Sequence, residues 1–180
     1  MRETIESWLK KSAQKLRNAK IESSQLDAEL ILANILKVER TFLHANSHKK
    51  LSKNVIFHAN NFLNKRLKRI PLAYIFREKE FFGRTFFVNE NVLVPRPETE
   101  TLIEITKKIA KNGDKILDVG TGSGIIPITL KAELGKNIDF FASDISLQAL
   151  SVANLNAIKI LESEIELFES DLLSQIPSEI

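Results

Sequence analysis

The chain has 180 residues, of which 43% are hydrophobic, with a net charge of +3 and no cysteine. This length suits one good-sized domain or two small ones, and the absence of cysteine excludes disulfides and thiolate metal sites. No stretch approaches the roughly 20 apolar residues that span a bilayer, and the charged N-terminus is unlike a signal peptide. We therefore expect a cytoplasmic protein without membrane contact and without a metal.

Charge is distributed unevenly along the chain. Residues 1–90 carry 18 Lys+Arg against 9 Asp+Glu, whereas residues 91–180 carry 8 against 14. This asymmetry predicts two modules, of which the first meets an acidic partner such as RNA or a protein bound to RNA. A lysine-rich, solvated helical surface is an equally good account of the same charges.

Residues 1–73 are predicted to form a small helical domain. Apolar residues recur at helical spacing on one face of its first helix, at Ile5, Trp8, Leu9, Ala13 and Leu16. Ser24 and Ser52 are candidate N-caps of two further helices, with a short helix near Thr41–Ala45 between them.

Residues 74–90 are predicted to form a β-hairpin linker. The run from Lys79 to Val88 holds two short aromatic segments on either side of Gly83-Arg84, which is a hairpin pattern. The next run, Pro95-Arg-Pro-Glu-Thr-Glu100, is typical of a helix start, because proline suits the first turn and acids suit the positive helix end.

A glycine-rich turn follows the apolar run Ile116–Val119 and precedes a helical pattern that starts at Ile125. A strand, a glycine turn and a helix in this order form the nucleotide-binding corner of an α/β sheet. Ile125 stands where the dinucleotide fingerprint needs glycine, and no lysine follows as in a P-loop. A second strand, Asp139–Asp144, ends in an acid that can accept hydrogen bonds from two hydroxyls.

The run Asp118-Val-Gly-Thr-Gly-Ser-Gly124 resembles motif I of S-adenosylmethionine-dependent methyltransferases. Together with Pro71-Leu-Ala-Tyr74, Glu80-Phe-Phe-Gly83 and Leu93–Glu100, in this order, the chain resembles the HemK family of protein-(glutamine-N5) methyltransferases. The resemblance implies a helical partner-binding domain at 1–73, the hairpin linker at 74–90, and a Rossmann-like cofactor domain at 91–180 that is incomplete at its C-terminal end.

The resemblance also implies S-adenosyl-L-methionine as cofactor and a peptide-chain release factor as protein substrate, methylated on the glutamine of its Gly-Gly-Gln motif. We expect a monomer that does not bind nucleic acid directly. The cofactor-binding residues that it implies are Asp118, Gly120, Thr121, Gly122, Ser123, Gly124, Asp144 for the ribose, and Asp171 and Leu172 beside the adenine. Arg96, Glu98 and Glu100 are candidates for the wall of the active site.

One departure from the family concerns its catalytic signature, Asn-Pro-Pro-Tyr. No Asn-Pro pair occurs in the 180 residues, so the resemblance implies no catalytic residue here and predicts an inactive chain. Without the strand that carries this signature, Ile116–Val119 is expected to present an unpaired edge. Two alternatives remain at this stage: part of a DNA or RNA amino-group methyltransferase, and a non-catalytic binding remnant.

Overall fold

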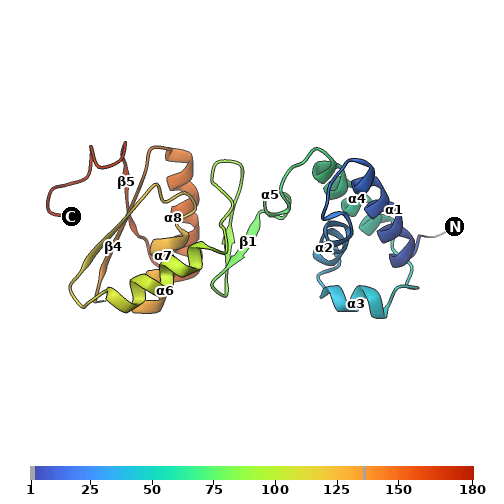
Figure 1. The fold of residues 1–180 in the computed structure, drawn as a ribbon, viewed down its shortest axis with the longest axis horizontal. Helices are drawn as coiled ribbons and strands as arrows, with labels where there is room; N and C mark the ends of the chain where they lie inside the picture. Colours follow the sequence, from blue (N-terminus) through green and yellow to red (C-terminus); the bar gives the residue numbers. More distant parts are fainter. Residues whose placement is uncertain (1–2, 136) are drawn as a thin grey trace. The chain divides into compact units, whose positions relative to one another are not determined.

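The computed structural model describes residues 3–135 and 137–180. The chain divides into two compact units between Phe76 and Arg77 (Figure 1). The first unit is helical, and the second combines helices with two small sheets. None of the helices in the described ranges is long and apolar enough to cross a membrane.

The first unit packs its helices around a single apolar core. Its helices are α1 (Ile5–Asn18), α2 (Ser24–Leu36), α3 (Arg40–Ala45), α4 (Lys53–Leu67) and α5 (Leu72–Phe76). Trp8 and Leu16 from α1 are fully buried against Ile31 and Leu32 of α2 and Leu63 of α4. The apolar face predicted for the first helix is therefore the one that the core covers.

Serine and threonine residues start two of these helices as their chemistry predicts. Thr4 and Ser7 form a capping box at α1, and the Ser52 hydroxyl accepts a hydrogen bond from the N–H of Val55 at 3.2 Å. At α2 the prediction is displaced by one residue, because Ser23 is the N-cap and its side chain makes no capping bond.

Two carboxylates lie inside the helical unit, each paired with an arginine. Asp27 accepts a 2.6 Å hydrogen bond from Arg66, and Glu29 accepts one of the same length from Arg40. Burial opposes ionisation of Glu29, but hydrogen bonds from Gln25 and Arg40 outweigh it and lower the pKa of this carboxyl.

The surplus of positive charge belongs wholly to residues 1–76, which carry 15 Lys+Arg and 6 Asp+Glu.

The second unit contains a parallel three-stranded sheet. Its elements are β1 (Glu78–Phe81), β2 (Arg84–Phe87), α6 (Thr99–Ile109), β3 (Lys115–Val119), α7 (Ile125–Leu134), β4 (Asp139–Asp144), α8 (Leu147–Leu161) and β5 (Glu166–Glu169). The strand order is β3-β4-β5, and Ile116 pairs with Phe140 and Ala142 with Leu167. A helical region, a hairpin and a truncated Rossmann-like sheet confirm the predicted fold class.

The sheet is covered by helices on the face that carries Phe140 and Ala142. Helix α7 packs on β3 and β4, α8 packs on β4 and β5, and α6 packs on α7. On the other face, Phe141 and Phe168 are half-buried, and their rings lie tilted toward each other with centroids 6.4 Å apart. Among the described strands β3 pairs with β4 alone, so the expected open edge is present.

The hairpin β1–β2 is part of the second unit, which differs from the linker predicted at 74–90. Phe81 and Phe86 lie in the same core as Ile103, Ile128 and Phe140, and this shared burial fixes the hairpin to the sheet domain. The predicted boundary at residue 73 also falls early, because α5 extends the helical unit to Phe76.

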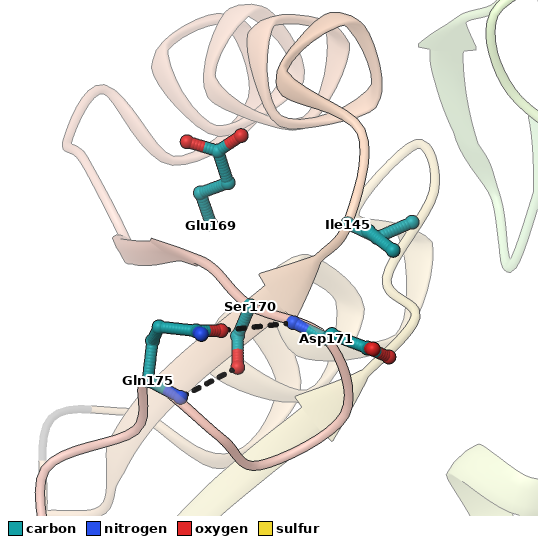
Figure 2. A pocket seen from close by; sticks show the side chains of 5 residues that line it. All are labelled: Ile145, Glu169, Ser170, Asp171 and Gln175. Carbon is teal, nitrogen blue, oxygen red and sulfur yellow. Dashed lines mark hydrogen bonds between the residues drawn. The ribbon is translucent and has the colours of Figure 1, made fainter.

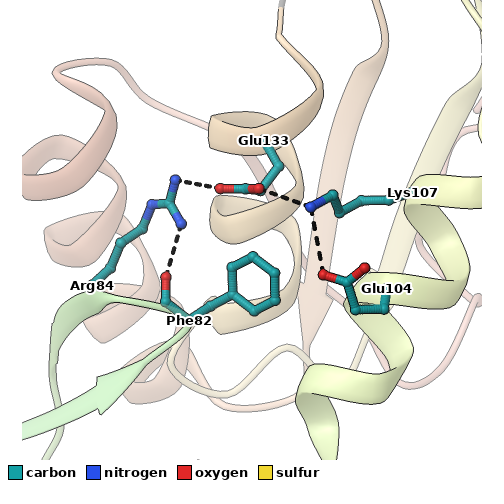
Figure 3. Close-up of polar contacts among 5 residues, drawn as sticks. All are labelled: Phe82, Arg84, Glu104, Lys107 and Glu133. Carbon is teal, nitrogen blue, oxygen red and sulfur yellow. Dashed lines mark hydrogen bonds and ion pairs between the residues drawn. The ribbon is translucent and has the colours of Figure 1, made fainter.

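Charged side chains further attach the hairpin turn to two helices (Figure 3). Glu133 of α7 accepts hydrogen bonds from Arg84 at 2.7 Å and from Lys107 of α6 at 2.9 Å. The hydrogen bond from Lys107, followed by that from Arg84, lowers the pKa of Glu133. Lys107 also lies 5.1 Å from the ring centroid of Phe82, in cation–π geometry.

Candidate cofactor site

The glycine turn joins β3 to α7 and is anchored on the end of β4. The N–H groups of Gly120 and Thr121 both donate to the carbonyl of Ser143, at 2.8 and 2.9 Å. Gly122 and Gly124 have φ angles of +56° and +75°, a region that glycine enters without steric cost. The turn is therefore held to the neighbouring strand through its backbone N–H groups, and its glycines present no side chain to a ligand.

Asp144, predicted to bind a ribose, ends β4 directly beside this turn. Its Oδ2 accepts a hydrogen bond from the N–H of Gly122 at 2.9 Å, and its Oδ1 accepts one from the N–H of Ser146 at 3.0 Å. A carboxylate offers about four acceptor positions, so two remain for a ligand. The two backbone donors orient this acid, and its charge is available for a charge-assisted hydrogen bond.

Asp118 lies on the other side of the turn, at the end of β3. Its Oδ2 is buried and has no hydrogen-bond partner in the part of the chain that the structure describes. Burial, reinforced by the charge of Asp144 and opposed by interaction with Thr121, raises the pKa of the Asp118 carboxyl above its ordinary 3.8. A buried acceptor without a donor is rare in native proteins, and a ligand that carries a cationic donor would supply one.

A pocket of about 370 Å³ adjoins Asp144 at the carboxyl ends of β4 and β5 (Figure 2). It is lined by Ile145, Glu169, Ser170, Asp171 and Gln175. Gln175 closes the turn after β5, since its Oε1 accepts from the N–H of Asp171 at 3.0 Å and its own N–H donates to the Ser170 hydroxyl at 3.1 Å. The carboxyl ends of parallel strands are where open α/β sheets bind ligands.

The predicted adenine-side residues lie at this pocket or next to it. Asp171 lines it, while Leu172 is 71% exposed and has a φ of +53°. Ile145 is 68% exposed and offers an apolar surface between Asp144 and Asp171 that the sequence did not single out.

The three candidates for an active-site wall are placed differently. Glu100 accepts a hydrogen bond from the N–H of Phe82 at 3.0 Å, so its carboxylate holds the hairpin turn. Arg96 and Glu98 are exposed, and within residues 3–135 and 137–180 no hydrogen bond or ion pair joins them to the glycine turn. Their role as a wall stays a prediction.

Sequence reasoning missed Asn156 of α8. It is fully buried, and its Nδ2 donates to the carbonyls of Ser123 and Phe87, both at 2.9 Å. Its Oδ1 accepts from the N–H of Phe87 at 2.7 Å. The available signal was an asparagine on the face that Ala149, Val152 and Ala153 mark as buried, where a polar side chain needs partners.

Known protein families match both units of the chain. Residues 7–76 match the family described as the PrmC N-terminal domain, and residues 97–180 match the methyltransferase small domain. A release factor glutamine methyltransferase of Leptospira interrogans serogroup Icterohaemorrhagiae serovar Lai is 42% identical over 182 residues, which cover 98% of this chain and 63% of that protein.

Two further relatives carry the same name. The one from Buchnera aphidicola subsp. Schizaphis graminum is 38% identical over 173 residues, covering 96% of this chain and 62% of that protein. The one from Dictyoglomus turgidum is 41% identical over 162 residues, covering 88% of this chain and 56% of that protein. The chain thus spans less than two thirds of the length of each of these relatives.

The parallel sheet with its glycine corner and the matched methyltransferase small domain define a domain of the class of methyltransferases that use S-adenosylmethionine as methyl donor. Within this class, the two parts of the chain match the PrmC N-terminal domain and the methyltransferase small domain, and the chain is similar to release factor glutamine methyltransferases. The resemblance identified from the sequence is confirmed at this level.

Proposed function

We propose that the glycine turn, Asp144 and the adjoining pocket form one binding site for S-adenosylmethionine. The observation that carries the proposal is the arrangement of two carboxylates around the turn: Asp144 oriented by Gly122, and Asp118 with a buried oxygen that lacks a donor. The cofactor carries hydroxyl donors on its ribose and a cationic ammonium group on its methionine part. These groups match the acceptors that the chain offers.

Each residue then has a defined task. Asp144 accepts the ribose hydroxyls, while Gly120–Gly124 let the methionine part approach the backbone. Asp171, Leu172 and Ile145 flank the adenine at the 370 Å³ pocket. Asp118 binds the ammonium group. The positive charge of this group would stabilise the ionised form of the Asp118 carboxylate. When bound, the cofactor supplies an electrophilic methyl group.

We further propose that the reaction is transfer of this methyl group to the side-chain amide of the glutamine in the Gly-Gly-Gln motif of a release factor. The names of the relatives support the release factor as substrate. In this proposal the family's asparagine and a backbone carbonyl would orient the amide nitrogen, and catalysis would come from positioning. No Asn-Pro pair occurs among these 180 residues, so we expect the chain alone to show no turnover.

The helical unit is proposed to dock the release factor. Residues 1–76 carry all of the excess positive charge, and the two most buried acids are neutralised by Arg66 and Arg40. Salt screens exposed charges over roughly 8–10 Å at physiological ionic strength, so binding of a release factor to this chain should weaken as salt is raised. RNA bound in place of the release factor would favour the nucleic-acid alternative.

Two measurements on the 180-residue chain test the proposal. Calorimetric titration with S-adenosylmethionine tests the site, and incubation with labelled cofactor and a release factor tests the reaction. We expect binding without transfer. Absence of binding would refute the cofactor site, and transfer at the rate of a longer relative would refute the need for the family signature.

A further inference from the structure

We propose that Asn156 is a positioning residue that couples the hairpin to the cofactor-binding turn. This inference rests on the function proposed above for the glycine turn. Asn156 is the point at which strand β2 and the turn meet: its amide group binds Phe87 of β2 through both of its polar atoms and Ser123 of the turn through Nδ2.

The amide of Asn156 behaves toward Phe87 as a neighbouring strand would. Its Oδ1 accepts from the Phe87 N–H at 2.7 Å, and its Nδ2 donates to the Phe87 carbonyl at 2.9 Å. This reciprocal pair fixes both the distance and the orientation of β2 relative to α8. The second Nδ2 hydrogen is directed to the Ser123 carbonyl at 2.9 Å, so both amide hydrogens are used.

The same helix face sets the position of the turn at Gly124. A Cβ at residue 124 would lie 3.1 Å from Ala153 Cβ and 2.8 Å from Ile128 Cδ1, which shows how closely the backbone approaches α8 there. Ala153 and Asn156 are one helical turn apart and face the same side. Ala153 therefore limits how near the turn can come, and Asn156 holds the adjacent Ser123 carbonyl.

Other contacts also hold the hairpin without touching the glycine turn: the Phe82 N–H donates to Glu100, and two further contacts involve Lys159 and Arg84. Lys159 of α8 donates to the carbonyl of Thr85 at 3.1 Å, and Arg84 pairs with Glu133 (Figure 3). Both lie at the surface, where ion pairs and hydrogen bonds contribute little. Asn156 is fully buried, and removing a buried partner leaves the Phe87 and Ser123 backbone groups unsatisfied, which costs far more.

Coupling through one side chain has a reciprocal consequence. If the cofactor fixes the turn, and the turn shares Asn156 with β2, then the ligand must also protect the hairpin. The amide of Phe87, which donates to Asn156, is the reporter. Its exchange with solvent deuterium should slow when S-adenosylmethionine is added, although Phe87 has no place in the cofactor site.

The test compares Asn156→Ala with Asn154→Ala in the 180-residue chain by residue-resolved amide hydrogen exchange. Asn154 is the matched control, since it lies on the same helix, is half-buried, and its side chain makes no hydrogen bond within the described ranges. Asn156→Ala should speed exchange at Phe87 about tenfold or more, and at Gly122 and Gly124 about fivefold, beyond any change in the slowest core amides. Asn154→Ala should change none of these amides.

Lys159→Ala separates the two halves of the coupling. It should loosen Thr85 and its neighbours while leaving Gly122 and Gly124 unchanged. If Asn156→Ala does not fold, Asn156→Ser replaces it in the same exchange experiment. Serine leaves a smaller void than alanine and retains a polar group, its hydroxyl. Faster exchange at Phe87 with unchanged Gly122 and Gly124 in the Asn156 variants would overturn the proposal, because the turn would then not depend on Asn156.

A cofactor titration provides the second readout. Asn156→Ala should weaken S-adenosylmethionine about tenfold, and Asn154→Ala should leave the affinity unchanged. If the unmodified chain binds no cofactor, the function proposed for the site fails, whereas the exchange comparison still decides the role of Asn156. If Asn156→Ala and the unmodified chain bind S-adenosylmethionine equally well, the proposal that Asn156 positions the turn for the cofactor is wrong.

Discussion

The Oδ2 atom of Asp144 accepts a hydrogen bond from the backbone N–H of Gly122 at 2.9 Å, across 22 residues of sequence. Together with the bonds from Gly120 and Thr121 to the Ser143 carbonyl, this bond connects the end of β4 to the turn that follows β3. It orients the carboxylate at the place where the family resemblance expects a ribose. Through the same bond, Asp144 also helps to hold the turn. A substitution at Asp144 should therefore affect both the contact with the ligand and the conformation of the turn.

Asp144→Ala should weaken S-adenosylmethionine about ten- to a hundredfold. The basis is the loss of charge-assisted hydrogen bonds, which contribute roughly 1.5–3 kcal/mol each, with 1.4 kcal/mol per decade of affinity. Isothermal titration measures the change. Asp139→Ala is the control, because Asp139 is an exposed acid at the opposite end of the same strand. Unchanged affinity in Asp144→Ala would reject the assignment of the site.

Gly124→Ala should destabilise the second unit more than Gly83→Ala does. Both glycines have positive φ, +75° and +69°, so either alanine incurs a left-handed strain of roughly 1–2 kcal/mol. At Gly83 nothing described lies within 4 Å of the added Cβ, whereas at Gly124 it meets Ile128 and Ala153, which adds roughly 1–3 kcal/mol of overpacking. Urea unfolding followed by circular dichroism compares the two. Equal losses in the free energy of unfolding would mean that the helices around Gly124 shift to accommodate the new methyl group without cost.

Asp118→Asn should stabilise the chain at neutral pH, and this gain should vanish in acid. Burial, together with the charge of Asp144, raises the pKa of Asp118 above its ordinary 3.8, so the folded state binds this proton more tightly than the unfolded state. The contribution to stability is complete below pH 3.8 and is lost as the pH rises through the folded pKa. Thermal unfolding at a series of pH values measures it, with the exposed Asp139→Asn as control. A gain that does not depend on pH would exclude ionisation as its cause.

Arg66→Ala should lower the stability of the helical unit alone. It leaves the Asp27 carboxylate, 4% exposed, without its 2.6 Å partner, which costs roughly 3–5 kcal/mol. Because the two cores share no residue, unfolding should occur in two steps. The single tryptophan, Trp8, lies in the helical core, so its fluorescence follows the first unit only.

Circular dichroism follows both units and completes this experiment. The transition seen by Trp8 should move to lower denaturant in Arg66→Ala, while the remaining dichroism transition stays in place. Lys68→Ala, at an exposed residue two positions further on, should move neither. A single shared transition in both probes would show that the units unfold together.

Local patterns predicted much of this molecule because they act over a few residues. The apolar spacing of α1 and the glycines after β3 specify their own conformations, and both were predicted correctly. Asn156 was missed because its partners lie 33 and 69 residues away and are backbone groups, which any residue offers. The local pattern predicts a hairpin but not its attachment, because the contacts with Glu100 and Glu133 come from residues 18 and 49 positions further along the chain.

The buried acids of α2 show the same limit. Asp27 and Glu29 look like ordinary surface residues of a helix, and only the fold brings Arg66 and Arg40 to them. The site is predictable in outline for a related reason: strand order in a parallel sheet brings the ends of β3, β4 and β5 together. The spacing of residues in the sequence does not predict which carboxylate oxygens of Asp118 and Asp144 are already hydrogen-bonded, because this depends on the three-dimensional geometry.

The close approach of Gly124 to Ala153 makes residue 153 useful for engineering. A larger side chain there, such as valine, would push the turn outward from α8 without altering any residue assigned to the ligand. Because the N–H of Gly122 bonds to Asp144, such a shift would also change the position of this carboxylate relative to the turn. Ala153 is thus a position at which the conformation of the turn can be altered from the side of α8 that faces it.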